Sequence, residues 1–554
     1  GGPGTGKTAV ALHRAAYLLY THRRKLERSG VLIVGPSSAF LRYIDQVLPS
    51  LGETGVVSRT ISDLIPGICA TDEDSPYAAK LKGMYRMRTV IANAIAARIR
   101  VPKNLPTIHV GGFSIPLLKE DIEIAQADAQ RTHQPHNQAR NTFIKTVLSI
   151  LKNRYLEKLD YVPDQAELND ITSQLRLDDK LRITLNLAWL PMTGEWLIDQ
   201  LFAKPDKLRT YAPWLSDEDI NSLTRPKGSP LTRSDIPLLD EAMELLGSDP
   251  KLDAQRSAAQ AKKLEEQQFA ADTLAQAGIG NGIVTADMLL DNLQGDDAGM
   301  IARKAASDRE WTYGHVVVDE AQELTAMDWR MLIRRCPSRS FTIVGDVAQT
   351  SALGGTHRWQ KNMNSLFGEP NWDLYELTIN YRNPSEVSEA ASKVATDSGL
   401  YISTVHAVRS VPDSLVSQTV ESQDELDTAL AESCTKLFEK FVSDDGSGRI
   451  AIITPNSMVS HAKKVVNQAL EHALPEKLWN QLNKQNADDC QCSVCKAEEV
   501  KGLEYDAVIV LQPSQIEQEA ASRLTAAANL YVAMTRPTQK LHIIRTADDA
   551  NFEK

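Results

Sequence analysis

Gly1-Gly2-Pro3-Gly4-Thr5-Gly6-Lys7-Thr8 matches the pattern G-x-x-x-x-G-K-[ST] at every fixed position. Glycines let successive backbone N–H groups turn toward one point, where a β carbon would exclude a phosphate group. The Lys7 ammonium is expected to reach the β- and γ-phosphates of ATP or GTP, and the Thr8 hydroxyl is a suitable Mg²⁺ ligand. The stretch therefore predicts an α/β fold with a phosphate-binding loop, in which all eight residues bind the nucleotide.

The same loop bears on the extent of the chain. A phosphate-binding loop of this type normally connects a strand to a helix, and no residue precedes Gly1. We therefore expect the chain to be a fragment that lacks the first strand of its sheet. On that expectation the fragment folds poorly, or hydrolyses nucleotide slowly, compared with a longer version of the protein.

Length and composition set the broad class. A chain of 554 residues is too long for one core, so two to four domains are expected. The six cysteines are too few for a disulfide framework and fit a reducing, cytoplasmic compartment. No apolar run is long enough to span a bilayer.

The net charge of −11 opposes wrapping of nucleic acid mainly by phosphate neutralisation, although it does not exclude a local basic groove. The excess of acidic over basic residues favours a protein as the partner.

Helices and strands alternate outward from the loop. Residues 7–20 read as a helix, Val31–Val34 as a buried parallel strand, and Ser37 or Ser38 as the cap of a helix that continues to about Val47. After a long interruption, further short apolar runs read as buried strands: 316–318, 342–344, 450–453, 507–510 and 541–544. This order predicts two parallel α/β sheets.

Two segments interrupt the alternation. Residues 73–230 are mostly polar helical stretches with a hairpin expected around Gly111-Gly112, and they predict an inserted domain. Residues 247–299 contain a helix rich in Ala, Gln, Glu and Lys and then an acidic turn, for which a solvated helix and loop is the simplest interpretation. The expected division is 1–72, 231–246 and 300–372 for a first α/β domain, 73–230 and 247–299 for its insertions, and 373–554 for a second α/β domain.

A second acidic element is needed to hold the metal and activate water. Val316-Val317-Val318-Asp319-Glu320 supplies it, because the strand delivers Asp319 at its carboxyl end, where it can join Thr8 as a Mg²⁺ ligand. Glu320 is then the candidate general base for the attacking water. Leu238-Leu239-Asp240-Glu241 is a similar run, but Pro237 removes a ladder donor and argues against a central strand there.

From Asp319 onward the chain resembles superfamily 1 helicases of the UvrD/Rep/PcrA group. The stretches that carry the resemblance are Asp319-Glu320-Ala321-Gln322 (motif II), Val344-Gly345-Asp346-Val347-Ala348-Gln349 (motif III), Leu377-Thr378-Ile379-Asn380-Tyr381-Arg382 (motif IV), Lys501-Gly502-Leu503-Glu504-Tyr505-Asp506 (motif V) and Leu530-Tyr531-Val532-Ala533-Met534-Thr535-Arg536 (motif VI). With the loop at residues 1–8, six motifs occur in the family's order. The resemblance implies two RecA-like P-loop NTPase domains with nucleotide between them, the first with mostly helical insertions.

The resemblance also implies roles for residues within these motifs. Gln349 would sense the γ-phosphate or orient the attacking water. Arg382 and Arg536 would reach over from the second domain and neutralise charge that develops on the γ-phosphoryl group. Tyr381 would stack on the base, and Glu504 would contact the ribose or couple the two domains.

A narrower resemblance is to the HelD family, actinobacterial class. It rests on His13-Arg14, Val34-Gly35-Pro36, Trp311-Thr312-Tyr313-Gly314-His315 and Arg334-Arg335-Cys336-Pro337. HelD proteins are helicase-like ATPases of Gram-positive bacteria that bind RNA polymerase and release it from nucleic acid. The resemblance implies RNA polymerase core as partner, a protein that is monomeric when free, a clamp-opening domain at 73–230 and a channel loop at 247–299. Acidic residues of that loop would approach the catalytic metal of the polymerase: Asp287, Asp291, Asp296 and Asp297.

Motif III departs from the translocating helicases. In UvrD-like enzymes it continues into aromatic residues that stack on single-stranded bases, at about 1–3 kcal/mol per base, whereas here Ala352 and Gly354 fall where rings belong. Lys501 also follows Arg382 by only 119 residues, which leaves little room for a large insertion in the second domain. Both points favour a motor that moves a protein partner. Two alternatives stay open: a DNA-translocating repair helicase, and a polymerase-binding module whose hydrolysis is incidental.

Three cysteines, Cys490, Cys492 and Cys495, have a metal-like spacing. A zinc site needs a fourth ligand, and none lies nearby in the sequence. Core or surface thiols are therefore the favoured interpretation.

Overall fold

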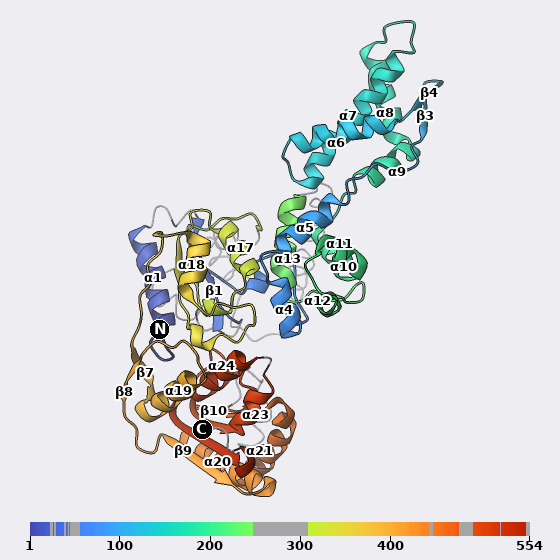
Figure 1. Ribbon diagram of the computed structural model, residues 1–554. Coiled ribbons are helices and arrows are strands. Elements are labelled where there is room, and N and C mark those ends of the chain that lie inside the picture. Colours follow the sequence, from blue (N-terminus) through green and yellow to red (C-terminus); the bar gives the residue numbers. More distant parts are fainter. Residues whose placement is uncertain are drawn as a thin grey trace, which may run out of the picture. The chain divides into compact units, whose positions relative to one another are not determined.

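The computed structural model describes residues 1–22, 26, 29–37, 40, 41, 44, 56–247, 308–442, 447–475, 491–520 and 522–549. The chain divides into two compact units (Figure 1). The first consists of Gly1–Ile68 and Asp297–Lys554, and the second of Cys69–Asp296.

The first sheet of the first unit is parallel, in the order β2-β1-β5-β6. Its strands are β1 (Val31–Val34), β2 (Val56–Arg59), β5 (His315–Val318) and β6 (Phe341–Ile343). β1 and β5 are buried along their whole length, as expected of central parallel strands that are covered on both faces. The helices of this part are α1 (Lys7–Thr21), α17 (Ala326–Arg335) and α18 (Trp359–Phe367).

α1 is amphipathic and packs its apolar face on this sheet. Leu12 and Leu19 share a core with Val31 and Ile33 of β1. The helix expected after β1 has its predicted cap, because the Phe40 N–H donates to the Ser37 hydroxyl at 3.2 Å. Much of that helix lies outside the described residues.

The second sheet is also parallel throughout, in the order β11-β10-β12-β13-β9. Its strands are β9 (Leu415–Val420), β10 (Ile450–Ile453), β11 (Cys492–Cys495), β12 (Tyr505–Leu511) and β13 (Pro537–Thr546). The helices are α19 (Ser385–Asp397), α20 (Gln423–Phe441), α21 (Val459–Ala473), α23 (Pro513–Gln518) and α24 (Arg523–Met534). One core joins the sheet to α19 and α24, and another joins it to α20 and α21. Two parallel sheets with helical cover confirm the predicted pair of RecA-like α/β domains.

A short parallel pair of strands, β7 (Ile379–Pro384) and β8 (His406–Arg409), precedes the second sheet in sequence. β13 and α19 both contact this pair. β7 carries most of the predicted motif IV, so the pair fixes where Tyr381 and Arg382 lie.

The second unit is mostly helical, as the sequence predicts for residues 73–230. The helices are α4 (Pro76–Lys82), α5 (Met87–Ala96), α6 (Lys119–Arg131), α7 (His136–Leu156), α8 (Gln165–Leu177), α9 (Asp179–Ala188), α10 (Gly194–Phe202), α11 (Pro205–Tyr211), α12 (Asp217–Leu223) and α13 (Asp235–Leu246). β3 (Thr107–Val110) and β4 (Phe113–Pro116) form the predicted hairpin. The hairpin and α6–α9 share one core around Phe143 and Trp189.

Residues 231–246 lie in this helical unit and not in the first RecA-like domain, where the sequence analysis placed them. The physical reason is the packing of α13, which contacts α5, α7 and α10. The run Leu238-Leu239-Asp240-Glu241 is part of this helix, so it is not a strand, as Pro237 indicated. The expected channel loop, including Asp287, Asp291, Asp296 and Asp297, lies outside the described residues except for Gly247.

The cysteine cluster forms part of the second sheet. β11 starts at Cys492, whose sulfur lies 3.9 Å from that of Cys434 on α20, and Cys490 lies outside the described residues. Within the described ranges, no group of three or more His, Cys, Asp or Glu side chains is arranged to hold a metal ion. Among the same residues, no helix has both the length and the apolarity that crossing a membrane requires.

Candidate active site

The phosphate-binding loop wraps into the start of α1. Gly6 precedes the helix in the left-handed region, with φ 77°, and Gly4 is also left-handed, with φ 69°. A β carbon on Gly4 would lie 2.1 Å from Asn380 Oδ1 and 2.6 Å from the β carbon of Arg382. The Tyr381 N–H donates to the Gly4 carbonyl at 3.0 Å. Glycine is therefore required here both for backbone conformation and because motif IV approaches the loop closely.

Lys7 lies against its own loop. Its ammonium donates to the Gly2 carbonyl at 2.7 Å, and the Thr5 hydroxyl donates to the same oxygen at 2.7 Å. Phosphate oxygens are stronger acceptors for an ammonium group than a neutral carbonyl. The side chain is thus held at the loop that would hold the phosphates, with a weak partner that a nucleotide can replace.

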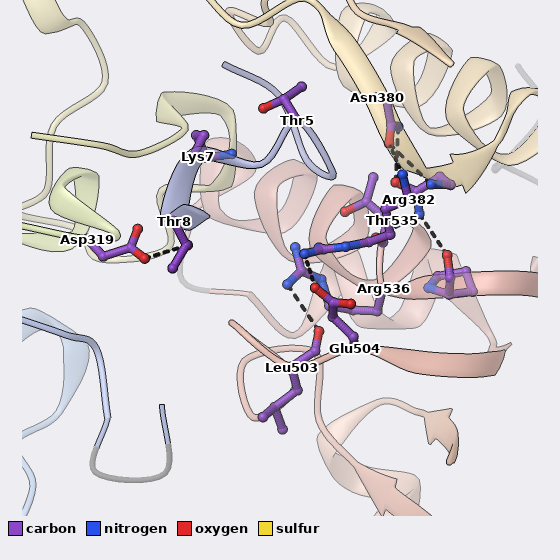
Figure 2. Close-up of polar contacts among 12 residues, drawn as sticks. Thr5, Lys7, Thr8, Asp319, Asn380, Arg382, Leu503, Glu504, Thr535 and Arg536 are labelled. Atoms are coloured by element: carbon purple, nitrogen blue, oxygen red, sulfur yellow. Dashed lines mark hydrogen bonds and ion pairs between the residues drawn. The ribbon is translucent and has the colours of Figure 1, made fainter. Parts of the chain in front are cut away.

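Thr8 and Asp319 bring the loop and motif II together. The Thr8 hydroxyl donates to Asp319 Oδ2 at 2.6 Å, as Figure 2 shows. Burial, the main cause, and the charge of Glu320, the second, raise the pKa of Asp319 to about 6. The hydrogen bond from Thr8 opposes this rise. A hydroxyl and a buried carboxylate are oxygen donors of the kind that Mg²⁺ prefers, and a cation there would offset the cost of the buried charge. The two residues therefore fit a Mg²⁺ site.

Glu320 has a strained backbone. Its φ of 47° and ψ of 39° place it in the left-handed region, which non-glycine residues rarely adopt. Its Oε2 accepts a hydrogen bond from Gln322 Nε2 at 2.5 Å. Burial favours the neutral acid, but the positive charges of Lys501 and Lys7 outweigh it and hold the pKa of Glu320 below its ordinary value. The carboxylate is ionised at neutral pH, as a general base must be.

Two further polar residues complete the floor of the site, and the sequence analysis gave neither a role. Gln322 is fully buried and also accepts from the Asp346 N–H at 3.0 Å, so it bridges motifs II and III. Asp346 is 4% exposed, and its Oδ2 has no hydrogen-bond partner among the described residues. Burial raises the pKa of Asp346, and the charge of Lys7 opposes the rise. Both residues lie within helicase motifs, and this is the sequence feature that points to them.

Motif VI reaches motif III through Arg536. This guanidinium is 2% exposed and donates to Gln349 Oε1 at 3.1 Å. It is also held by the carbonyls of Val532, at 3.2 Å, and Leu503, at 3.4 Å. Burial and the neighbouring charge of Arg382 lower the pKa of Arg536 to about 10. Arg536 therefore stays charged at neutral pH and is fixed in position beside Gln349.

Arg382 and Glu504 form an ion pair within the same site (Figure 2). Asn380 Oδ1 accepts from the Arg382 N–H at 3.0 Å and so fixes the backbone that carries this arginine. Tyr381 is 60% exposed, so its ring is accessible for stacking. Glu504 thus contacts Arg382, a partner that the sequence analysis did not assign to it.

Lys501, the first residue of motif V, is a further site residue, and the sequence predicted no role for it. Its ammonium donates to the Gln349 carbonyl at 2.6 Å, to Ser351 Oγ at 3.2 Å and to the carboxylate of Glu323. Glu323 also accepts from the N–H groups of Ser351, at 2.9 Å, and Ala352, at 3.1 Å. One lysine from the second RecA-like domain therefore holds the end of motif II and the end of motif III together.

The fold and these contacts define a P-loop site that can bind a nucleoside triphosphate with Mg²⁺ and hydrolyse it. Residues 426–545 match a family model described as viral superfamily 1 RNA helicase core domain. The match covers the part of the chain that contains motifs V and VI, and it shows a similarity to superfamily 1 helicases, a class of NTP-hydrolysing enzymes that use a nucleotide and Mg²⁺.

Comparison with solved structures returned a low similarity to the C-terminal domain of a possible DNA helicase from Lactobacillus plantarum WCFS1. The identity is 16% and the TM-score 0.21, over 30% of this chain and 87% of that chain. No curated protein matches.

Proposed function

We propose that this protein is an ATP- or GTP-hydrolysing, helicase-like motor in which motifs from both RecA-like domains act on one nucleotide. The observation that carries the proposal is the contact between Arg536 and Gln349, because it puts a buried cation of the second domain beside motif III of the first. Thr8 and Asp319 would hold the Mg²⁺, which supplies charge neutralisation at the β- and γ-phosphates.

The chain's own residues then have distinct tasks. Lys7 would leave the Gly2 carbonyl and bind the β- and γ-phosphate oxygens. Glu320 would accept a proton from the attacking water, which Gln349 orients. Arg536 and Arg382 would stabilise the charge that develops on the transferred phosphoryl group, once Arg382 exchanges Glu504 for phosphate oxygens.

The nucleotide site is tested by Lys7→Ala. Removal of the ammonium should reduce turnover of ATP and GTP by at least about 10²-fold, because one positive group at the transferring phosphate is lost. Turnover of each nucleotide is measured by phosphate release, with Lys463→Ala, on the exposed face of α21, as the matched control. Wild-type turnover by Lys7→Ala would contradict the proposal.

We further propose that the motor acts on RNA polymerase core and releases it from nucleic acid. Three observations support this partner: the HelD-like motifs, a large helical unit inserted between motifs of the first RecA-like domain, and the small residues Ala352 and Gly354 where translocating helicases carry base-stacking rings. Pull-down of RNA polymerase by the protein, with and without the whole helical unit, residues 69–296, tests it. Equal capture by both would refute the role of the helical unit.

The match of residues 426–545 to a helicase core favours a second candidate, a motor that moves along nucleic acid. Strong stimulation of hydrolysis by single-stranded DNA, without any effect of polymerase, would select this alternative. A polymerase-binding module with incidental hydrolysis would instead be selected if Lys7→Ala left polymerase release intact.

A further inference from the structure

The helical unit contains a long run of sequence without acidic side chains. Residues 75–119 include eight lysines and arginines and no aspartate or glutamate. The whole chain has 72 acidic and 61 basic residues, so this run opposes the net charge of −11. It contains α5 and the segment that follows α5, and the nucleotide site makes no use of it.

α11 lies beside α5 and adds further positive charge. The side-chain amide of Asn93 on α5 donates to the Tyr211 carbonyl at the end of α11, at 3.2 Å. At the other end of α11, burial and the positive charges of Arg98, Lys204 and Arg100 lower the pKa of Lys207. Lys204, which caps α11, and Lys207 in its first turn therefore lie near the arginines that follow α5.

The result is a set of cations at the ends of the two helices, which we name the α5–α11 strip. Its members are Arg86, Arg98, Arg100, Lys204 and Lys207. The strip extends over at least the length of α5, which at 1.5 Å per residue is about 15 Å.

Aromatic rings lie at both ends of the strip. The Arg86 guanidinium lies 5.4 Å from the ring centre of Trp214, and that of Arg98 lies 5.1 Å from the ring centre of Trp196. Trp196 is 36% exposed, so part of its ring stays open to a ligand.

The strip has no acidic partner among the described residues. Arg100 Nε donates to the neutral carbonyl of Leu187 at 3.3 Å, and Arg98 Nε is buried without an acceptor within the described part of the chain. Asp206, which is next to the strip in sequence, instead pairs with Arg209 at 3.4 Å. Like charges are thus held together without internal compensation, which favours uptake of an external polyanion.

We propose that the α5–α11 strip binds single-stranded nucleic acid, with phosphates on the cations and a base on Trp196. Cations at both ends of a helix, each with a ring beside it, suit a strand, since every nucleotide offers both a phosphate and a π face. An acidic protein surface would use the charges but not the ring. The inference goes beyond the proposed motor activity and does not depend on nucleotide hydrolysis.

The test measures fluorescence anisotropy of a short labelled oligothymidylate with the full chain, from about 50 to 200 mM salt. The triple variant R100Q/K204Q/K207Q removes three phosphate contacts. Each contact on a single strand contributes about 0.7 to the slope of log affinity against log salt, so the slope should fall by about 2 and the affinity at low salt by about tenfold or more. The matched control R131Q/R176Q/R182Q removes three exposed charges from α6, α8 and α9 and should change neither quantity.

A second variant separates stacking from charge. Trp196→Leu should weaken binding about fivefold or more and leave the salt slope unchanged. Nucleotide hydrolysis, measured in parallel, should stay at the wild-type rate in all these variants, which separates failure of the strip from failure of the motor site.

Three outcomes would overturn the proposal. One is an equal loss of affinity in the triple variant and its control. Another is wild-type affinity in Trp196→Leu. The third is displacement of the oligonucleotide by poly-L-glutamate at equal charge concentration, because the strip would then recognise acidic protein surfaces as well as it recognises a strand.

Discussion

At the scale of single residues, the carboxylate of Glu320 has the protonation state that water activation requires. We expect Glu320→Gln to reduce hydrolysis by about 10² to 10⁴-fold, because the amide cannot accept the proton. Binding of a fluorescent nucleotide analogue should persist, since Lys7 and Thr8 are unchanged. Glu310→Gln, at an exposed position, is the control. A loss of less than tenfold would show that Glu320 is not the base.

Lys501 is the residue whose charge contributes most to lowering the pKa of Glu320. With Lys501→Met the pKa of Glu320 should rise, so the acidic limb of the pH–rate profile should move to higher pH. The rate at neutral pH should also fall by about tenfold, because the Gln349 carbonyl loses its partner. An unchanged acidic limb, with or without a slower rate, would mean that Lys501 acts only through structure.

At the scale of elements, His315 connects β5 to β6. Its ring nitrogens lie 2.8 Å from Ser340 Oγ and 2.9 Å from Thr342 Oγ1, and burial lowers the pKa of His315 to about 4. Since the folded pKa lies below the unfolded value near 6.5, the neutral ring contributes stability above pH 6.5. That contribution is lost as the pH falls toward 4.

This histidine should therefore make the first RecA-like domain sensitive to acid. From the difference in pKa, the loss between pH 6.5 and 4 is about 3 kcal/mol. Replacement by glutamine, which keeps a hydrogen-bonding group but does not titrate, should flatten the dependence of the melting temperature on pH over this window. Identical pH dependence in His315→Gln and the wild type would show that another group controls acid unfolding.

At the scale of the whole molecule, the helical unit has an ionic core of its own. Lys82 is 1% exposed and lies 2.8 Å from Asp74 and 2.9 Å from Asp235, which is fully buried. Lys82→Met would remove the ion pair of Asp74. Asp235 would keep only Arg225, at 2.6 Å, so the expected cost is about 3 kcal/mol. Because the chain forms two compact units, calorimetry should show one lowered transition while the transition of the RecA-like unit stays in place. Lys80→Met on the same helix is the control, and a loss of both transitions would refute independent unfolding.

Features that depend on local pattern follow from the amino-acid sequence without any knowledge of the packing. The loop at residues 1–8, the buried strands and the hairpin at Gly111-Gly112 follow from backbone conformation and from apolar runs, which act over a few residues. The sequence also determined that Pro237 excludes a central strand, because proline lacks the ladder donor.

Contacts between distant segments, in contrast, are known only from the folded chain. The partners of Lys501, the bridge that Gln322 makes to Asp346 and the place of α13 in the helical unit all depend on residues far apart in the chain. Local propensity carries no information about such contacts, since they form when sheets and helices pack and bury their polar groups together. The α5–α11 strip has the same origin, because two helices separated by about a hundred residues place their charges side by side.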